Sequence, residues 1–143
     1  MSGWSRGVEI WGQWHAHSTW RLIPAYTWLR RELWAGPGSR TVENRYQTGE
    51  DPAHQGSLRS LWEFSRAWQF DVTALGVGRV PSAGVAGYVR VDARLGWRPV
   101  RAHEFSVTLQ NLTDTNRLEF IPDGLYFALR QRRAVVVRWA FRP

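Results

Sequence analysis

The residues with the most obvious metal-binding chemistry are two histidines, His15 and His17, which lie two positions apart in a short polar segment. Imidazole nitrogens are common metal ligands, and two residues with this spacing on an extended chain point to the same side. No third ligand lies near them in the sequence, and the chain has no cysteine that could supply a thiolate or form a disulfide. We therefore expect no metal site and no cofactor.

The sequence also gives little support for a nucleophilic catalytic site or a phosphate-binding loop. Serine, histidine and aspartate all occur, but no spacing among them suggests a catalytic triad. The glycines of Gly76-Val77-Gly78 and Gly84 are not followed by the Gly-Lys-Ser/Thr of a phosphate-binding loop. We therefore predict no catalytic residues and no enzymatic activity; an outer-membrane lipase or protease is the alternative, and it would need a constellation of catalytic residues that the sequence does not show.

Arginine and tryptophan are the unusual components of the sequence. All 19 basic residues are arginine, the net charge is +7, and there are ten tryptophans. Basic side chains with aromatic stacking platforms are typical of proteins that bind nucleic acid, so a soluble basic β-sheet domain that binds a polyanion is one hypothesis. The arginines and tryptophans fall on opposite faces of the same predicted strands, whereas a stacking surface needs them interleaved. The arginines on this polar face are Arg59, Arg90, Arg94 and Arg138, and the acidic residues that could pair with them are Asp71, Asp92 and Glu104.

The clearest element is a hairpin over residues 88–110. Apolar residues occupy alternate positions from Val89 to Trp97 and again from Phe105 to Leu109, with polar residues between them. Because successive side chains of a strand point to opposite sides, this pattern predicts two strands with one apolar and one polar face. The same alternation recurs along the chain and predicts an all-β, antiparallel up-and-down meander of about seven strands. The other predicted strands cover residues 7–14, 20–28, 56–64, 68–74 and 134–141, with an irregularity at Pro24.

The predicted connections alternate in length. Residues 15–18, 65–67 and 98–102 form tight turns, whereas residues 35–52, 76–87 and 113–124 form long loops rich in glycine, proline or charge. In a meander, alternate connections lie at opposite ends of the sheet, so one end carries only tight turns. Short turns at one end and long loops at the other are typical of outer-membrane β-barrels.

Aromatic residues cluster where the tight turns are expected. They lie on the apolar face and would form a girdle at a membrane interface, where amphipathic rings are well placed. The mid-strand apolar positions are small or aliphatic, which suits a lipid-facing band. A soluble β-sandwich that buries these aromatics is the alternative. The girdle residues are Trp14, Trp20, Phe64, Trp68, Trp97, Phe105, Trp139 and Phe141, with Tyr26 and Trp28 near the opposite end.

With these elements placed, the sequence resembles the C-terminal β-barrel portion of a TonB-dependent outer-membrane receptor. The resemblance covers about residues 53–143, and residues 7–34 fit a preceding hairpin less specifically. The motif residues are Asn111, Leu112 and Asp114 in the turn that closes the penultimate strand, Glu119 and Phe120 after it, and Phe141 in the aromatic-ended last strand. The strands that carry the match read Tyr88-Val89-Arg90-Val91-Asp92-Ala93-Arg94-Leu95-Gly96-Trp97-Arg98-Pro99 and Phe105-Ser106-Val107-Thr108-Leu109-Gln110.

The resemblance implies a barrel of about 22 strands with a plug domain and a segment that engages the TonB system. Residues 1–143 would form a single partial barrel domain in the outer membrane of a Gram-negative bacterium, with no plug and no signal peptide. Its partners would be outer-membrane lipid, the rest of the receptor and a small-molecule ligand such as a siderophore, met by the long loops at 35–52 and 113–124; no nucleic acid is expected. Such a segment would not transport anything alone. The predicted lumen-facing residues are Arg59, Asp71, Arg90, Asp92, Arg94 and Arg138.

Overall fold

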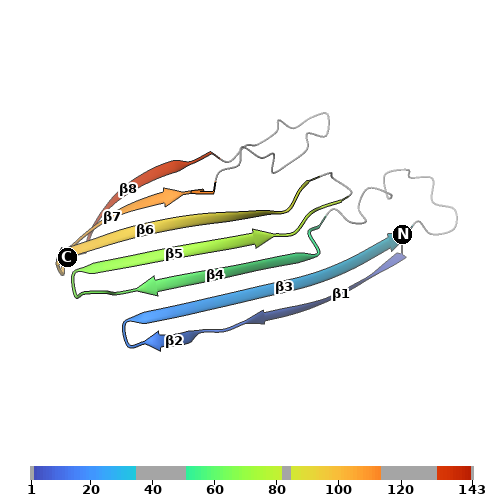
Figure 1. Ribbon diagram of the computed structural model, residues 1–143, viewed down its shortest axis with the longest axis horizontal. Coiled ribbons are helices and arrows are strands. Elements are labelled where there is room, and N and C mark those ends of the chain that lie inside the picture. The colour runs from blue at the N-terminus through green and yellow to red at the C-terminus, as the bar shows by residue number, and fades with distance from the viewer. Residues whose placement is uncertain (1, 35–50, 82–84, 114–131, 143) are drawn as a thin grey trace.

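A computed structural model describes residues 2–34, 51–81, 85–113 and 132–142, and these residues form one curved antiparallel sheet with no helix (Figure 1). The sheet follows the order β1-β3-β4-β5-β6-β7-β8, and the short β2 pairs with β3. The predicted all-β up-and-down meander is therefore confirmed. The strands are β1 (Ser2–Trp11), β2 (Trp14–His17), β3 (Trp20–Trp34), β4 (His54–Trp62), β5 (Trp68–Val77), β6 (Tyr88–Val100), β7 (His103–Gln110) and β8 (Ala134–Phe141).

The predicted alternation of connections is present in the sheet. The hairpins β2–β3, β4–β5 and β6–β7 close at one end, where β8 also ends, and the connections from β3 to β4, from β5 to β6 and from β7 to β8 start and finish at the other end (Figure 1). The turn between β4 and β5 is held by Ser65, whose Oγ accepts hydrogen bonds from the backbone N–H groups of Ala67 at 3.3 Å and Trp68 at 3.1 Å. Most residues of the predicted long loops at 35–52 and 113–124 lie outside the described residues.

The two strands of the first hairpin are longer than the sequence pattern predicts, and β5 also continues past the expected end at residue 74 to Val77, into the predicted loop at 76–87. β1 and β3 pair continuously from Ser2↔Trp34 to Trp11↔Ala25, so the first hairpin extends well beyond the expected residues 7–14 and 20–28. The predicted turn at 15–18 is also displaced, because β2 includes His17 and the chain reverses at Ser18 and Thr19. Alternation locates the middle of a strand well, but it fades where polar residues occupy both faces, as they do around Arg30 and Arg31.

The irregularity predicted at Pro24 occurs in the neighbouring strand. β3 pairs with β4 without a register shift through Pro24↔Leu58. On the other side, β1 stops at Trp11 and β2 begins at Trp14, so the break faces Pro24. The N–H of Gly12 donates to the carbonyl of Pro24 at 3.1 Å, and proline has no N–H to return a bond. The missing donor therefore interrupts the partner strand and leaves β3 continuous.

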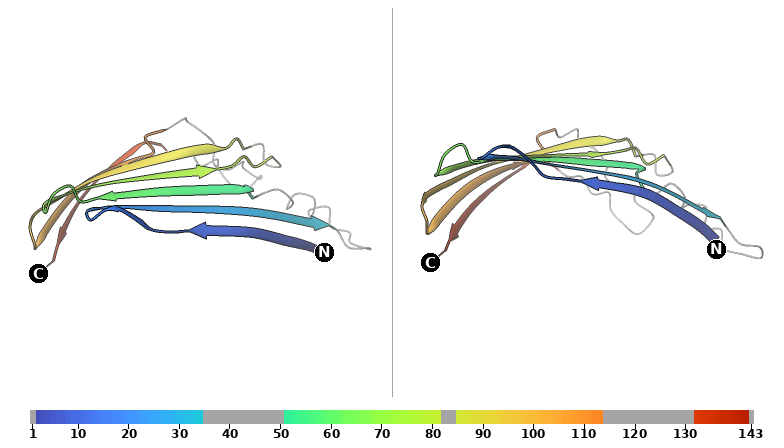
Figure 2. Two further views of the ribbon diagram at one scale, coloured as in Figure 1. Left: turned by 60° about the horizontal axis from the view of Figure 1, so that its bottom comes forward. Right: turned by 90° about the horizontal axis from the view of Figure 1, so that it is seen from below.

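The sheet is a single layer with both faces uncovered among the described residues. Val80, at 8% exposure, is the one buried apolar residue there, so the β-sandwich alternative is wrong for this part of the chain. The sheet bends along its length into a trough (Figure 2). Side chains converge on the concave side of a bent sheet and splay apart on the convex side. None of the described residues forms a helix long and apolar enough to span a bilayer.

Candidate functional site: an aromatic belt and an opposite ion network

One face of the sheet is apolar from edge to edge. The strand registers place the alternating apolar residues of neighbouring strands directly opposite one another, as in Phe70↔Leu95 and Leu95↔Val107. The large residues of this face remain exposed, for example Val137 at 75%. Water does not normally meet an apolar surface of this extent on a monomeric protein, so this face requires an apolar medium or a covering partner.

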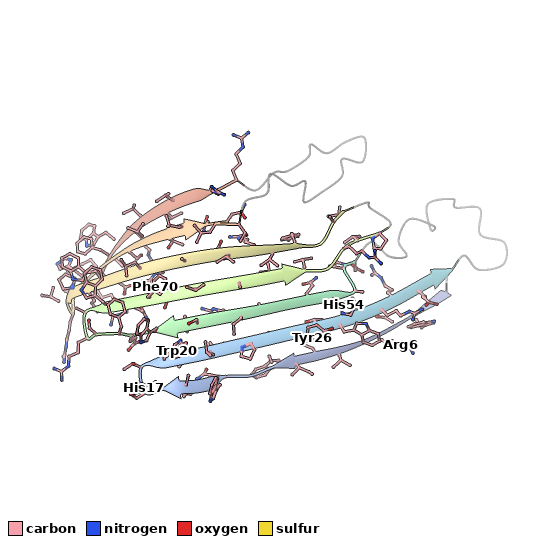
Figure 3. All side chains as sticks on the ribbon, viewed as in Figure 1. Arg6, His17, Trp20, Tyr26, His54 and Phe70 are labelled. Atoms are coloured by element: carbon pink, nitrogen blue, oxygen red, sulfur yellow. The ribbon has the colours of Figure 1, made fainter. Side chains whose placement is uncertain are left out.

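A continuous belt of rings bounds the apolar face at the tight-turn end. Ring centroids lie 5.4 Å apart for Trp62 and Phe64, 6.5 Å for Phe64 and Trp68, 5.7 Å for Trp68 and Trp97, and 5.7 Å for Trp97 and Phe105. These distances are typical of aromatic pairs that attract one another. The belt therefore links four successive strands at one level, which Figure 3 shows as the crowd of rings at the tight-turn end.

The belt continues at both sides. Trp139 lies opposite Phe105 in the ladder, and its Nε1 donates a hydrogen bond to Nδ1 of His103 at 3.2 Å. His103 also lies 5.2 Å from the ring of Phe141. On the other side, Trp20 lies opposite Trp62. The sequence pattern identified most of these rings but missed Trp62 and His103, because it ended one strand at Phe64 and began another near Phe105.

The predicted lumen-facing residues all lie on the other face. The ladders place Arg59 opposite Thr73, Asp71 opposite Arg94, and Arg138 opposite Ser106, on the side away from the belt. Arg90 and Asp92 alternate with the belt-side residues of β6 and share that side. The large belt-side residues are mostly exposed, and so are Arg59 and Arg138, whereas Asp71, Arg90, Asp92 and Arg94 in the middle of the polar face are half-buried. This contrast identifies the polar face as the concave one.

Arg94 is the centre of an ion network on the polar face. Its Nη1 donates to Oδ2 of Asp71 on β5 at 2.9 Å and to Gln69 at 3.2 Å, while its Nη2 donates to Oε1 of Glu104 on β7 at 2.5 Å. Glu104 also lies 3.4 Å from Nη2 of Arg98. One guanidinium on β6 therefore joins three strands, and the pairing of these arginines with Asp71 and Glu104 that the sequence suggested is present.

A second ion pair explains the predicted turn motif. Arg90 holds Asp92 with two hydrogen bonds of 3.0 and 2.7 Å, and Asp92 Oδ1 accepts the backbone N–H of Asn111 at 2.8 Å. The next N–H, of Leu112, donates to the carbonyl of Val91 at 2.8 Å. Asn111 has a φ of 55°, a left-handed conformation that asparagine tolerates. Asn111 and Leu112 thus fold the end of β7 back onto β6, whereas Asp114, Glu119 and Phe120 lie outside the described residues.

The two histidines that could bind a metal make only local contacts. Nε2 of His15 lies 2.7 Å from the side-chain nitrogen of Gln13, and Nδ1 of His17 lies 3.3 Å from the Thr19 hydroxyl. A register shift separates the two histidines along β2. No group of three or more His, Asp or Glu side chains with metal-binding geometry occurs in the described part of the chain.

Together these features define a class of structure: one wall of an up-and-down β-barrel, with an apolar convex face and a charged concave face. A solved structure of this class matches it, the siderophore receptor PiuA from Acinetobacter baumannii, with a TM-score of 0.75 and 19% sequence identity. The match covers 97% of this chain and 22% of the receptor chain, so the sequence spans about a fifth of the length of that protein. The predicted resemblance is confirmed at the level of the fold. No protein-family model matches the sequence, and no curated protein matches it significantly.

Proposed function

We propose that this chain forms part of the wall of a TonB-dependent receptor barrel in the outer membrane of a Gram-negative bacterium. The observation that carries the proposal is the exposed apolar face bounded by the aromatic belt. Transmembrane barrels present an apolar band to lipid and place aromatic girdles at the interfaces. The belt from Trp62 to Phe105 matches such a girdle, and the apolar residues beyond it match the lipid-facing band.

The role of the whole assembly would be uptake of siderophores or similar scarce ligands rather than catalysis. The structurally similar protein is a siderophore receptor by name. The chain would act with the remaining strands, a plug domain and the TonB system. Within the described sheet, β1 and β8 are the edge strands, and open edges are not tolerated in lipid. The chain is therefore a wall segment that needs further strands, and it would not transport a ligand by itself.

The concave face supports an interior role for the six predicted lumen-facing residues. The half-buried pairs Arg90–Asp92 and Arg94–Asp71 neutralise much of the positive charge on this face. Oδ1 of Asp71 is buried and has no hydrogen-bond partner among the described residues. A polar plug packed into the trough would supply partners of this kind. We assign Arg59, Asp71, Arg90, Asp92, Arg94 and Arg138 to the barrel interior.

The second candidate function, polyanion binding by a soluble basic sheet, has weaker support. Arg90 and Arg94 are already paired with carboxylates, and the aromatic belt lies on the face opposite to them. A stacked nucleic acid would need many arginines interleaved with the aromatic rings of one surface, and the paired strand residues on the belt side that the structure describes include only two arginines, Arg6 and Arg30. Binding of nucleic acid is therefore not expected.

The deciding experiment is refolding of the chain in detergent micelles and in plain buffer. Far-UV circular dichroism and heat-modifiable gel mobility report the fold in each condition. A β-rich species that forms only in detergent and migrates differently without boiling would support the membrane wall. A β-rich monomer that is stable in buffer would overturn it and favour the polyanion binder.

A further inference from the structure

The apolar face ends in a charged cluster at the end opposite the tight turns. β1 and β3 extend beyond the other strands there, and Arg6 lies directly opposite Arg30 in their ladder. Figure 3 shows Arg6 at this end, with Trp20 and His17 at the other. Among the paired strand residues on the apolar face that the structure describes, only Arg6, Arg30 and Glu32 carry charge. The cluster thus marks a boundary between apolar surface and a polar zone.

Two indole rings hold the guanidinium groups of this cluster in place. Cζ of Arg6 lies 4.8 Å from the ring centroid of Trp4 and 5.9 Å from that of Trp28. Cζ of Arg30 lies 5.9 Å from the same Trp4 ring. Stacked guanidiniums lose less side-chain freedom when they bind a ligand, because the rings already restrict them.

The charge balance of the cluster favours an anion. Like charges directly opposite each other in a ladder destabilise it. Glu32 pairs with Arg30 at 2.7 Å and neutralises one of the two arginines. No described carboxylate lies within ion-pair distance of Arg6, so the cluster keeps a net positive charge on an exposed surface. An anion placed between the two guanidiniums would relieve their repulsion.

The position of the cluster along the strand identifies the source of that anion. Arg30 lies ten residues after Trp20, which belongs to the aromatic belt. At about 3.3 Å per residue this is about 33 Å along the strand, and a strand tilt of about 40° reduces it to about 25 Å across the bilayer. An apolar band of a transmembrane barrel is about 25 Å tall. Arg6 and Arg30 therefore lie where the headgroups of the far leaflet begin when the belt lies at the near interface.

We propose that Arg6 and Arg30, stacked on Trp4 and Trp28, form a binding site for the phosphate of a membrane lipid headgroup, with the acyl chains lying along the apolar face. The inference rests on the proposed function, because it needs this face to meet lipid. Guanidinium groups bind phosphate through paired, charge-assisted hydrogen bonds. Glu32 competes with the phosphate for Arg30 and so limits the affinity of the site.

The test uses the full chain refolded in zwitterionic detergent micelles, after the gel assay has shown that it folds there. Native mass spectrometry measures the binding of phosphatidic acid and of phosphatidylcholine with the same acyl chains. The double variant Arg6→Gln/Arg30→Gln should lower phosphatidic acid affinity by about tenfold or more. The matched control Arg59→Gln/Arg138→Gln removes the same charge from the opposite face and should leave the affinity unchanged. Glu32→Gln should raise it by about threefold.

Four results would overturn the inference. Equal losses in the two double variants would show general attraction by net charge. Displacement of the lipid by millimolar inorganic phosphate would show a site for free anion. A Glu32→Gln variant with unchanged affinity would contradict the role of Arg30, and this readout remains if the double variant fails to refold. Folding in plain buffer would instead overturn the proposed function, whereas a detergent-folded chain without lipid preference overturns only this inference.

Discussion

Replacement of Arg94 with methionine should lower the stability of the sheet more than any other single arginine change on the concave face. The guanidinium bonds Asp71 and Gln69 on β5 and Glu104 on β7, so its loss removes links to both neighbouring strands. It also leaves two carboxylates facing each other across β6 without the cation between them. Methionine keeps most of the aliphatic bulk, so the change tests the charge and the hydrogen bonds.

The burial of the groups sets the magnitude. The side chains are 25% exposed for Arg94, 17% for Asp71 and 18% for Glu104. Breaking a fully buried pair costs about 3–5 kcal/mol, and breaking a surface pair costs about 0–1 kcal/mol. These groups lie between the two limits, and two pairs are lost at once. We therefore expect the free energy of unfolding to fall by about 2–3 kcal/mol.

The assay is urea unfolding of the chain in detergent micelles, followed by tryptophan fluorescence. Arg59→Met is the matched control, because Arg59 is exposed on the same face and no described carboxylate pairs with it. This substitution should change the free energy of unfolding by no more than about 0.5 kcal/mol. In a double-mutant cycle, Arg94→Met and Glu104→Gln should couple by about 1 kcal/mol, whereas Arg94→Met and Arg59→Met should be additive. Equal costs for the two single arginine variants, or no coupling with Glu104, would refute the network.

The remaining predictions concern the backbone, the belt and the turn. Gly7→Ala should lower the urea midpoint, because a Cβ there would lie 2.7 Å from the carbonyl oxygen of Trp28. Gly12→Ala is the control, because a Cβ at that position has open space around it and should be tolerated. Equal midpoints for the two variants would contradict the close approach at Gly7. Trp97→Ala removes two ring contacts of the belt and should lower the free energy of unfolding in micelles by about 1–3 kcal/mol. A decrease no larger than that caused by substitution of an isolated surface residue would argue against a continuous belt. Asn111 has a φ of 55°, so Asn111→Ala should lower the free energy of unfolding by about 1–2 kcal/mol in the same assay, and Asn111→Gly should lower it less. A larger loss for Asn111→Gly than for Asn111→Ala would show that the side chain of Asn111 matters more than its backbone conformation.

The sequence determined the fold class through local patterns. Alternation such as that from Val89 to Trp97 fixes which side chains share a face, because the side-chain period of a strand is two. Short connections join consecutive strands into hairpins, so the alternation of short and long connections predicts which strand ends lie at the same end of the sheet. These two local properties predicted the meander, the belt side of the sheet and the common face of Arg90 and Arg94.

The tertiary structure decided which residues meet across strands. Asp71 and Arg94 are 23 residues apart, and Arg6 and Arg30 are 24 apart, so only the register of the ladders brings each pair together. A shift of two residues would keep every side chain on its predicted face and yet change every partner. The position of the irregularity at Pro24 was likewise not predictable from the sequence, since the missing N–H of Pro24 interrupts the partner strand and not β3 itself.

Strand ends were likewise decided by pairing and not by pattern. The sequence pattern ended the first hairpin near Trp28, because Arg30 and Arg31 interrupt the alternation. In the structure the backbone bonds between β1 and β3 continue to Trp34, since a ladder needs only paired N–H and C=O groups and not an apolar face. The cluster of Arg6 and Arg30 lies in this extension, which is why the sequence alone gave no sign of it.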